Sequence, residues 1–468
     1  MFNFKNKNMK NIKHTIFGCV LVLGLATSCS KDELDIQPTS SIAEAQYFKN
    51  DADILGAVIA IYDGMQAVPK REFAVTEMRS DNGTTLRHEG EYKQLETFDV
   101  DPTNSVSSGY YTANYNVVFR ANIVLENINV MTDAGKKVNY DAEAKFARAL
   151  SYFNLVRAYG EVPLITKVIR LTDADYKTSD NFAKKSVASI YTLIEEDLKV
   201  AVLGLPSKTG TTFGRATKEA AQGLLAKVYL TEKKYTDALP LLTTLVASTQ
   251  YSLQAAYTNI FYTEGNSEIM FAIPYTASSS TESQDFSAEM TISGVANGLD
   301  YVTDNFRAFM TANAADQRTA TNILNVPTTN KAYGQNNKFT STLGKIAGND
   351  WIVLRLADVY LMYTEAIMGT ATSTIDADAI KYYDKVRNRA FTVPVTSLIV
   401  TKAMLLDQRR AEFAYENQRL YDLIRFDQAQ TVLSAYSTTF QGPKDLLLPL
   451  PQSEINSSFG KLIQNPLY

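Results

Sequence analysis

The chain has 468 residues, of which 45% are hydrophobic, and its 46 basic and 50 acidic residues give a formal net charge of −4. This composition is typical of an ordinary folded protein, and the mildly acidic balance provides no basic field for nucleic acid. Two cysteines and two histidines leave little room for thiol chemistry or for zinc sites.

The first 28 residues have the three parts of an export signal. A basic start precedes an apolar run from Ile16 to Ala26, and two small residues follow. The run is too short to span a bilayer core, which takes roughly twenty residues. Small residues that lead directly into a cysteine are typical of bacterial lipoproteins, although Leu25 lies one place further from the cysteine than usual. The pattern predicts removal of residues 1–28 and attachment of lipid at Cys29.

The residues after Cys29 predict where this lipoprotein goes. The stretch from Ser30 to Asp35 is rich in acidic residues and resembles the tag that sends some Gram-negative lipoproteins to the outer face of the outer membrane. An ordinary polar tether over residues 29–45 is the alternative. No other membrane-embedded segment is needed or visible after residue 29.

Removal of the export signal excludes further kinds of catalytic and metal-binding site. It removes four lysines and no acids, so the net charge moves from −4 to −8, and it leaves His88 as the one histidine. A Ser-His-Asp triad would have to be built around His88, and sites with two or three histidines on zinc are excluded. With Cys29 acylated, no disulfide or free thiol remains.

The rest of the chain predicts one mostly α domain, residues 29–468, because no long Pro/Gly/Ser linker divides it. Helices are expected near residues 52–65, 115–130 and 187–202. Apolar residues from Phe146 to Val156 recur at helical spacing, and this helix should end near Gly160 because Pro163 forbids its continuation.

Residues 221–245 match the small and large positions of a tetratricopeptide helix pair, with alanines where the helices approach and tyrosines in the groove. Residues 352–369 and 376–389 form a second, looser pair. Such units stack because neither helix buries its apolar face alone. Three stretches, 68–112, 250–350 and 431–468, have little helical period, and their frequent aromatic residues predict folded loop excursions.

Five blocks then match one family in order along the chain. The segment ARALSYFNLVRAYGEVPLI at 147–165 closely resembles the central signature of the SusD/RagB family of outer-membrane nutrient-binding lipoproteins. The other blocks are LRLADVYLMYTEA at 354–366, KVRNRA at 385–390, the arginine-rich segment 408–426, and LPLP at 448–451 leading to QNP at 464–466. Gln408 and Thr364 depart from the family pattern, and each could weaken a local contact.

The resemblance implies a helical scaffold of tetratricopeptide-like units that binds oligosaccharides and helps load a TonB-dependent (SusC-like) outer-membrane transporter, without catalysis or cofactor. Two alternatives stay open. One is a tetratricopeptide protein that binds only protein or peptide, and the other is a surface glycoside hydrolase.

The arginine-rich segment bears on the hydrolase alternative. Glu412 and Glu416 lie one helical turn apart among several arginines, and paired carboxylates can act as the acid and base of a glycosidase. Neighbouring arginines would hold both carboxylates ionised, so an ion-pair network on one long helix from Gln408 to Phe426 is the favoured interpretation.

Candidate ligand contacts come from the excursions, since sugar sites combine aromatic faces with a few polar groups. The predicted glycan-binding residues of the first excursion are Asp81, Asn82, Arg87 and Tyr92, where the family places much of its ligand contact. Those of the second are Tyr275, Phe286 and Tyr301.

Two further features of the sequence favour ordinary structural roles. Trp351 directly precedes a predicted helix starting at Ile352, so core packing is favoured over sugar stacking. Asp99, Asp101 and Asn104 lack the remaining features of a calcium loop, and no metal is predicted.

Overall fold

The computed structural model describes residues 47–85, 90–178, 180–209, 211–290, 300–324, 338–339 and 346–468, and the backbone of residues 334–335. The predicted export signal, Cys29, Arg87 and His88 lie outside these residues. Two units are distinguished, Met1–Lys49 and Asn50–Tyr468, and all the elements below belong to the second.

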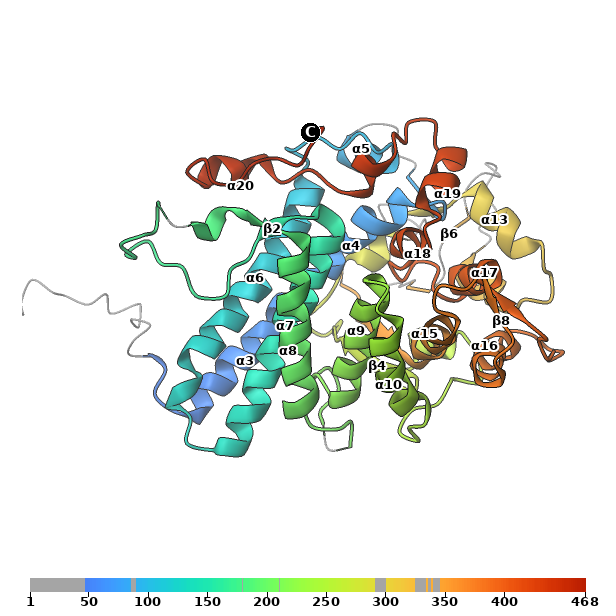
Figure 1. Cartoon of the computed structure of the whole chain (residues 1–468), viewed down its shortest axis with the longest axis horizontal. Helices are drawn as coiled ribbons and strands as arrows, with labels where there is room; N and C mark the ends of the chain where they lie inside the picture. The colour runs from blue at the N-terminus through green and yellow to red at the C-terminus, as the bar shows by residue number, and fades with distance from the viewer. Residues whose placement is uncertain are drawn as a thin grey trace, which may run out of the picture. The chain divides into compact units, whose positions relative to one another are not determined.

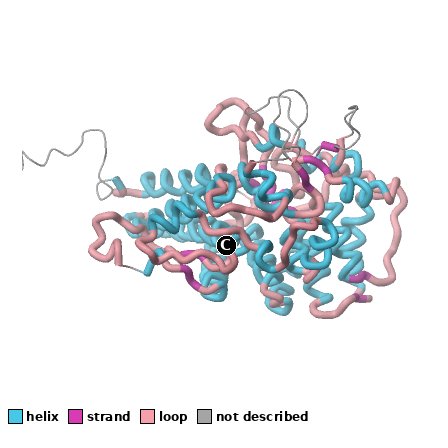
Figure 2. The backbone as a smooth tube through the Cα atoms, turned by 90° about the horizontal axis from the view of Figure 1, so that it is seen from above, coloured by secondary structure: helices cyan, strands magenta, loops and turns pink. Residues whose placement is uncertain are grey.

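Helices dominate the described structure, as the sequence predicts (Figures 1 and 2). The main helices are α3 (Asp51–Met65), α6 (Ser105–Asn127), α7 (Ala134–Tyr159), α8 (Val187–Gly204), α9 (Lys218–Thr231), α10 (Tyr235–Val246), α15 (Leu356–Met368), α16 (Ala377–Arg389) and α17 (Lys402–Glu412). Each of α6, α7, α8, α9 and α10 packs against the next, and α10 packs on α15 and α15 on α16. This row of packed helix pairs confirms the predicted tetratricopeptide-like class.

The central helix α7 shows how local sequence sets these elements. It begins where the Asp133 side chain caps the backbone N–H of Lys136, and it ends at Gly160, whose φ of 73° is unfavourable for residues with a Cβ. A Cβ on Gly160 would also lie 2.9 Å from Leu447 Cδ1. The predicted end of the helix is therefore confirmed, and glycine permits both the turn and a close contact with the C-terminal segment.

The two predicted helix pairs form, with one correction at the start of the second. Thr364 departs from the family pattern but strengthens the pair, because its hydroxyl donates to Ala379 O of α16 at 2.9 Å. Residues Trp351–Arg355 are the strand β7, not the first turn of a helix, and α15 begins at Leu356. β7 pairs with β4 (Ile269–Ile273), and buried apolar side chains cover both strands. A short apolar run is compatible with a strand or a helix, and here the pairing with the distant segment 269–273 makes it a strand.

The arginine-rich segment also differs from the prediction of one long helix. It forms α17 and α18 (Arg419–Arg425), separated by a turn in which Tyr415 and Asn417 have φ of 62° and 59°. The turn is held from outside, because the carboxyl group of Glu77 accepts a hydrogen bond from the backbone N–H of Asn417 at 2.9 Å.

The predicted ion-pair network around this segment is confirmed. Arg355 donates to Glu412 at 2.6 Å and to Glu416 at 2.8 Å, and Arg409 joins Asp358 and Asp422 at 2.8 Å each. These groups are almost fully buried. Burial alone would raise the pKa of Glu412, but the charges of three arginines outweigh it and hold that pKa well below its ordinary value. Glu412 therefore has no proton to donate near neutral pH.

The excursions are folded, and they contain more regular structure than the sequence predicts. Residues 68–112 hold α4 (Pro69–Thr76), α5 (Glu91–Glu96) and the first turns of α6. The later short helices are α11 (Asn259–Tyr262), α12 (Phe286–Glu289), α13 (Asp304–Thr311), α14 (Arg318–Asn322), α19 (Ala429–Tyr436) and α20 (Gln452–Ser457). The remaining strands are β1 (Gly83–Thr84), β2 (Val162–Pro163), β3 (Lys184–Lys185), β5 (Tyr301–Val302), β6 (Gly334–Gln335), β8 (Ser373–Thr374) and β9 (Val400–Thr401).

A small sheet ties the first excursion to the second. Its strand order is β1-β5-β6, and Thr84 lies opposite Tyr301. Segments more than 200 residues apart in the chain thus meet at one edge of the helical scaffold. Within the described residues, no helix has the length and apolar character needed to cross a membrane.

Candidate functional site

Two of the predicted ligand residues of the first excursion, Asp81 and Asn82, lie where the two excursions meet. Asp81 and Asn82 directly precede β1, and the carbonyl of Asn82 accepts hydrogen bonds from the backbone N–H of Thr303 and from the hydroxyl of Tyr415, each at 2.9 Å. The β1-β5-β6 sheet therefore brings Asp81, Asn82 and Tyr301 into one neighbourhood.

Asp81 is a buried, charged residue at the junction of the two excursions. Its two carboxylate oxygens accept from Nε and Nη2 of Arg419 at 2.7 and 2.8 Å, and Nη2 of Arg410 lies 2.9 Å from Oδ2. The carboxylate is 3% exposed. Burial raises the pKa of Asp81, but the hydrogen bonds and charge of Arg419, with the charge of Arg410, outweigh burial and leave the pKa below its ordinary value. Asp81 is thus an ionised anchor with both oxygens occupied.

Arg410 connects the buried Asp81 carboxylate with residues at the surface. Its Nε donates to the Asn82 side chain at 2.9 Å, and its Nη2 donates to the Asn305 side chain of α13 at 2.7 Å. The guanidinium also lies 4.7 Å from the ring centroid of Phe309, one turn further along α13. Burial lowers the pKa of Arg410 to about 10, and the group stays charged near neutral pH. Arg410 therefore fixes an exposed amide and a partly exposed ring beside each other.

Tyr92 contributes a second, partly exposed ring to the surface of the first excursion. It lies on α5, is partly exposed, and stacks on Phe73 with ring centroids 6.3 Å apart and planes at 16°. The next turn of α5 carries Glu96, which accepts from the Thr84 hydroxyl at 2.8 Å and from Lys93 at 3.1 Å. This helix thus presents an aromatic face and a carboxylate together.

Tyr436 of α19 completes the surface. Burial raises the pKa of the Tyr436 phenol, and the negative charges of Glu96 and Asp81 raise it further. We call the partly or fully exposed set of side chains above Asp81 and Arg410 the loop face. Its members are Thr84, Tyr92, Glu96, Asn305, Phe309 and Tyr436.

The structure places the predicted residues of the second excursion in the interior. The hydroxyl of Tyr275 donates to Gln66 O at 2.6 Å, and the ring of Phe286 packs edge-on against Tyr275 and Trp351 at 5.7 and 5.3 Å. Tyr301 is 4% exposed. These three rings offer no open face in this conformation, and Trp351 belongs to the core, as the sequence favours.

Two residues considered as calcium ligands have local structural roles. Asp101 accepts from the backbone and hydroxyl of Thr103, and Asn104 caps the start of α6. The absence of a required metal stays a prediction.

Of the loop face, sequence reasoning missed Thr84, Glu96, Asn305, Phe309 and Tyr436. Asn305 and Phe309 lie four residues apart on one helical turn, which is a readable signal for a shared face. Their relation to residues near position 82 depends on Arg410, more than 300 positions later, and no local pattern reveals it.

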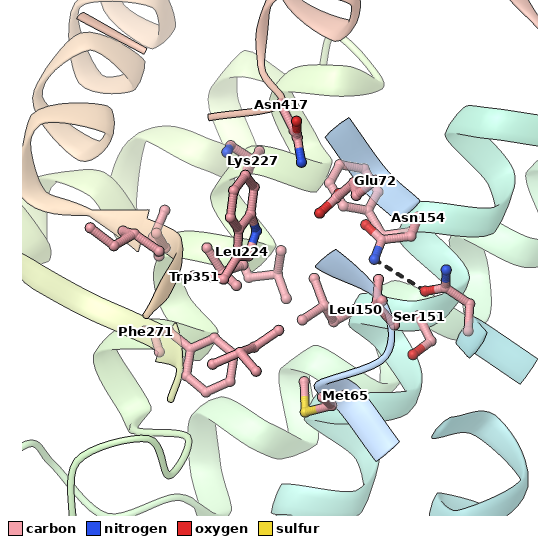
Figure 3. Close-up of a pocket in the computed structure, with 18 of the residues that line it drawn as sticks. Met65, Glu72, Leu150, Ser151, Asn154, Leu224, Lys227, Phe271, Trp351 and Asn417 are labelled. Atoms are coloured by element: carbon pink, nitrogen blue, oxygen red, sulfur yellow. Dashed lines mark hydrogen bonds between the residues drawn. The ribbon is translucent and has the colours of Figure 1, made fainter. Parts of the chain in front are cut away.

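A separate interior cavity lies among α4, α7, α9 and the β4-β7 pair (Figure 3). Polar groups such as Glu72, Ser151 and Asn417 share its lining with Leu224 and Trp351, and the dashed bond joins Asn154 to Asn114 at 3.1 Å. The cavity has a volume of about 50 Å³. This is room for a few water molecules and too little for a sugar ring.

The fold and the loop face together define a tetratricopeptide-like scaffold protein with folded loop excursions. A family model described as "SusD family" matches residues 255–468, and one described as "Starch-binding associating with outer membrane" matches residues 33–230. The chain belongs to the SusD/RagB family.

Individual relatives align with half of the chain or more. SusD-like protein P2 of Formosa agariphila is 26% identical over 519 aligned residues, covering 97% of this chain and 100% of the relative. The starch-binding protein SusD of Bacteroides thetaiotaomicron is 23% identical over 249 residues, which is 50% of this chain and 43% of that protein.

Solved structures support the same fold. A laminarin binding SusD-like protein superimposes with a TM-score of 0.76 at 25% identity, over 90% of this chain and 100% of the other. Surface glycan-binding protein A from Bacteroides thetaiotaomicron, in complex with laminarihexaose, has a TM-score of 0.74 at 21% identity, over 89% and 99% of the two chains, and this likeness concerns the fold alone.

Proposed function

We propose that this protein is a non-catalytic, lipid-anchored glycan-binding protein of the outer-membrane surface that passes oligosaccharides to a TonB-dependent (SusC-like) transporter. The observation that carries the proposal is the loop face, where Arg410 holds an amide and an aromatic ring beside each other above a fixed ionic base. Three similar proteins are named for the ligands they bind, which are starch, laminarin and surface glycans. These names support the same substrate class.

The chemistry of the loop face suits a neutral, hydroxyl-rich ligand. Tyr92 and Phe309 provide rings on which the apolar face of a sugar can stack, and the carboxylate of Glu96 and the exposed side-chain amide of Asn305 provide polar groups for its hydroxyls. Asp81, Asn82 and Arg410 act beneath this layer, since their polar atoms are largely engaged with one another. Their role in binding is to position the outer residues, and Arg87 stays a candidate for direct contact.

The absence of catalysis is proposed from the state of the carboxylates. A glycosidase needs two accessible carboxyl groups on either side of the scissile bond, one of them able to donate a proton. Glu412 and Glu416 are buried in ion pairs with Arg355, and Glu96 is engaged by Thr84 and Lys93.

Binding and turnover can be separated in one experiment. The protein is titrated calorimetrically with laminari-, malto- and other oligosaccharides and with peptides, and each mixture is then assayed for new reducing ends over several hours. We expect binding to one linkage class and a constant amount of reducing ends. Binding to peptides alone, or release of reducing ends, would overturn the proposal.

The anchor and the transporter are tested in membranes. Metabolic labelling with a fatty acid should mark the wild-type chain and not a Cys29→Ala variant. Capture of the lipidated protein from mildly solubilised membranes should recover a large transporter in near-equal amount. Repeated recovery of the protein alone would count against the partnership.

A further inference from the structure

A second pocket, of about 300 Å³, lies between α6, the connection that follows β2, and the segment around α20. Figure 1 shows these elements together at one end of the row of helices, and the pocket shares no lining residue with the loop face. We call it the α6–α20 pocket. Its lining comprises Tyr111, Tyr115, Val118, Phe119, Asn122, Pro163, Ile165, Lys167, Ile169, Tyr176, Phe182, Glu454, Ser458 and Leu462.

Aromatic rings form two walls of the pocket. From α6, Tyr111 and Tyr115 lie with ring centroids 4.7 Å apart, and Phe119, one turn on, is 47% exposed. From the connection after β2, Tyr176 and Phe182 pack edge to face at 5.8 Å. The Tyr115 hydroxyl donates to Pro163 O at 2.6 Å, so the α6 wall is held in place without a ligand.

One carboxylate enters this aromatic pocket from the C-terminal side. Glu454 is partly buried, and within the described residues its carboxylate has no hydrogen bond or ion pair. Glu454 lines the pocket together with Tyr111 and Tyr115. Burial raises the pKa of Glu454, because the carboxylate has lost water and has gained no hydrogen-bond donor from the described residues.

A positively charged side chain also lines this pocket. Lys167 lines it and is exposed. The pocket therefore offers an acceptor, a donor and aromatic faces together, and a ligand of either charge would meet one group of its own sign. A lipid chain would leave the Glu454 carboxylate without a donor. A neutral ring with several hydroxyls satisfies all three features.

We infer that the α6–α20 pocket is a second carbohydrate site, which binds one or two sugar rings between the aromatic walls, with ligand hydroxyls donating to Glu454 and accepting from Lys167. The inference rests on the proposed function for its ligand class and is independent of it in location. The volume lies at the low end of small-ligand pockets, which suits a terminal residue or disaccharide and not a long chain.

The test uses the full chain in mild detergent and a panel of mono- and disaccharides at up to millimolar concentration, read by calorimetry. Phe119→Ala removes one exposed ring of the α6 wall, and Glu454→Gln replaces the charged carboxylate by a weaker, neutral acceptor. Both positions are partly exposed, so the fold should survive. Phe213→Ala, an aromatic residue 41% exposed elsewhere, is the control. A Tyr92→Ala/Phe309→Ala variant disables the loop face.

We expect at least tenfold weaker binding of the small sugar in Phe119→Ala and Glu454→Gln, and unchanged binding in Phe213→Ala and in the loop-face variant. If oligosaccharides bind at the loop face but no mono- or disaccharide responds to the pocket variants, the second site is overturned and the proposed function stands. If no oligosaccharide binds the wild-type protein at all, the proposed function fails. If the pocket variants impair only transporter capture, the pocket serves a protein partner and the inference is overturned.

Discussion

Replacement of Asp81 by asparagine tests whether this residue is an ionic anchor or a ligand clamp. The change keeps the size of the side chain, so no cavity forms, but it removes the charge that faces Arg419 and Arg410. Three contacts of 2.7, 2.8 and 2.9 Å are weakened, and the two guanidinium groups are only 5% and 8% exposed. Removal of one partner of a buried ion pair costs about 3–5 kcal/mol, so we expect a loss near the lower end, about 3 kcal/mol.

The assay is urea unfolding of wild type and Asp81→Asn, followed by tryptophan fluorescence and circular dichroism. Asp180→Asn is the matched control, because Asp180 pairs with Lys461 at 3.4 Å but is 75% exposed, and a surface pair contributes about 0–1 kcal/mol. The pKa of folded Asp81 lies below its ordinary value near 3.9, so its stabilisation is complete above about pH 4 and is lost as the pH falls further. The difference between the two proteins should therefore shrink in acid.

A contrary result is clearly defined. If Asp81→Asn changes the unfolding free energy by less than about 1 kcal/mol while it abolishes glycan binding, the carboxylate contacts ligand directly and the anchor interpretation is wrong.

Three further predictions concern the scaffold. Gly204→Ala should destabilise by about 1–3 kcal/mol in urea unfolding, because the new Cβ would lie 2.8 Å from the Ala142 Cβ of α7, whereas Gly109→Ala, whose nearest neighbour would be 3.7 Å away, should stabilise by about 0.5–1 kcal/mol. Burial raises the pKa of Glu77 to about 8, so wild type loses stability relative to Glu77→Gln as pH rises from about 4 to 8; a pH-independent difference would contradict this. Tyr275→Phe should cost about 1 kcal/mol and leave glycan affinity unchanged; a tenfold weaker affinity would restore Tyr275 as a ligand contact.

The scaffold could be predicted from the sequence because its signals are local. Helical spacing of apolar residues, small residues at close helix contacts, and Gly160 before Pro163 each act within one or two turns. The predictions were wrong where contacts with a segment far away in the sequence determine the local structure. Residues 351–355 became a strand because 269–273 lies beside them, and the segment after Gln408 broke into two helices at a turn that Glu77 holds.

The candidate site was harder to predict for the same reason. The sequence predicts ligand contacts in the first excursion, but residue type does not distinguish a polar side chain that faces solvent from one that is buried in ion pairs. Asp81 and Asn82 are interior because Arg410 and Arg419 reach them from more than 300 positions away. Asn305 and Phe309 are placed on the surface by the same arginine.

The most direct test of the central claim is calorimetric titration of the best-bound oligosaccharide into wild type, Tyr92→Ala, Phe309→Ala and the control Phe213→Ala. Loss of one stacking face should weaken binding about tenfold, equivalent to about 1.4 kcal/mol, in each loop-face variant and leave the control unchanged. Equal affinity in all four proteins would contradict the assignment of glycan binding to the loop face.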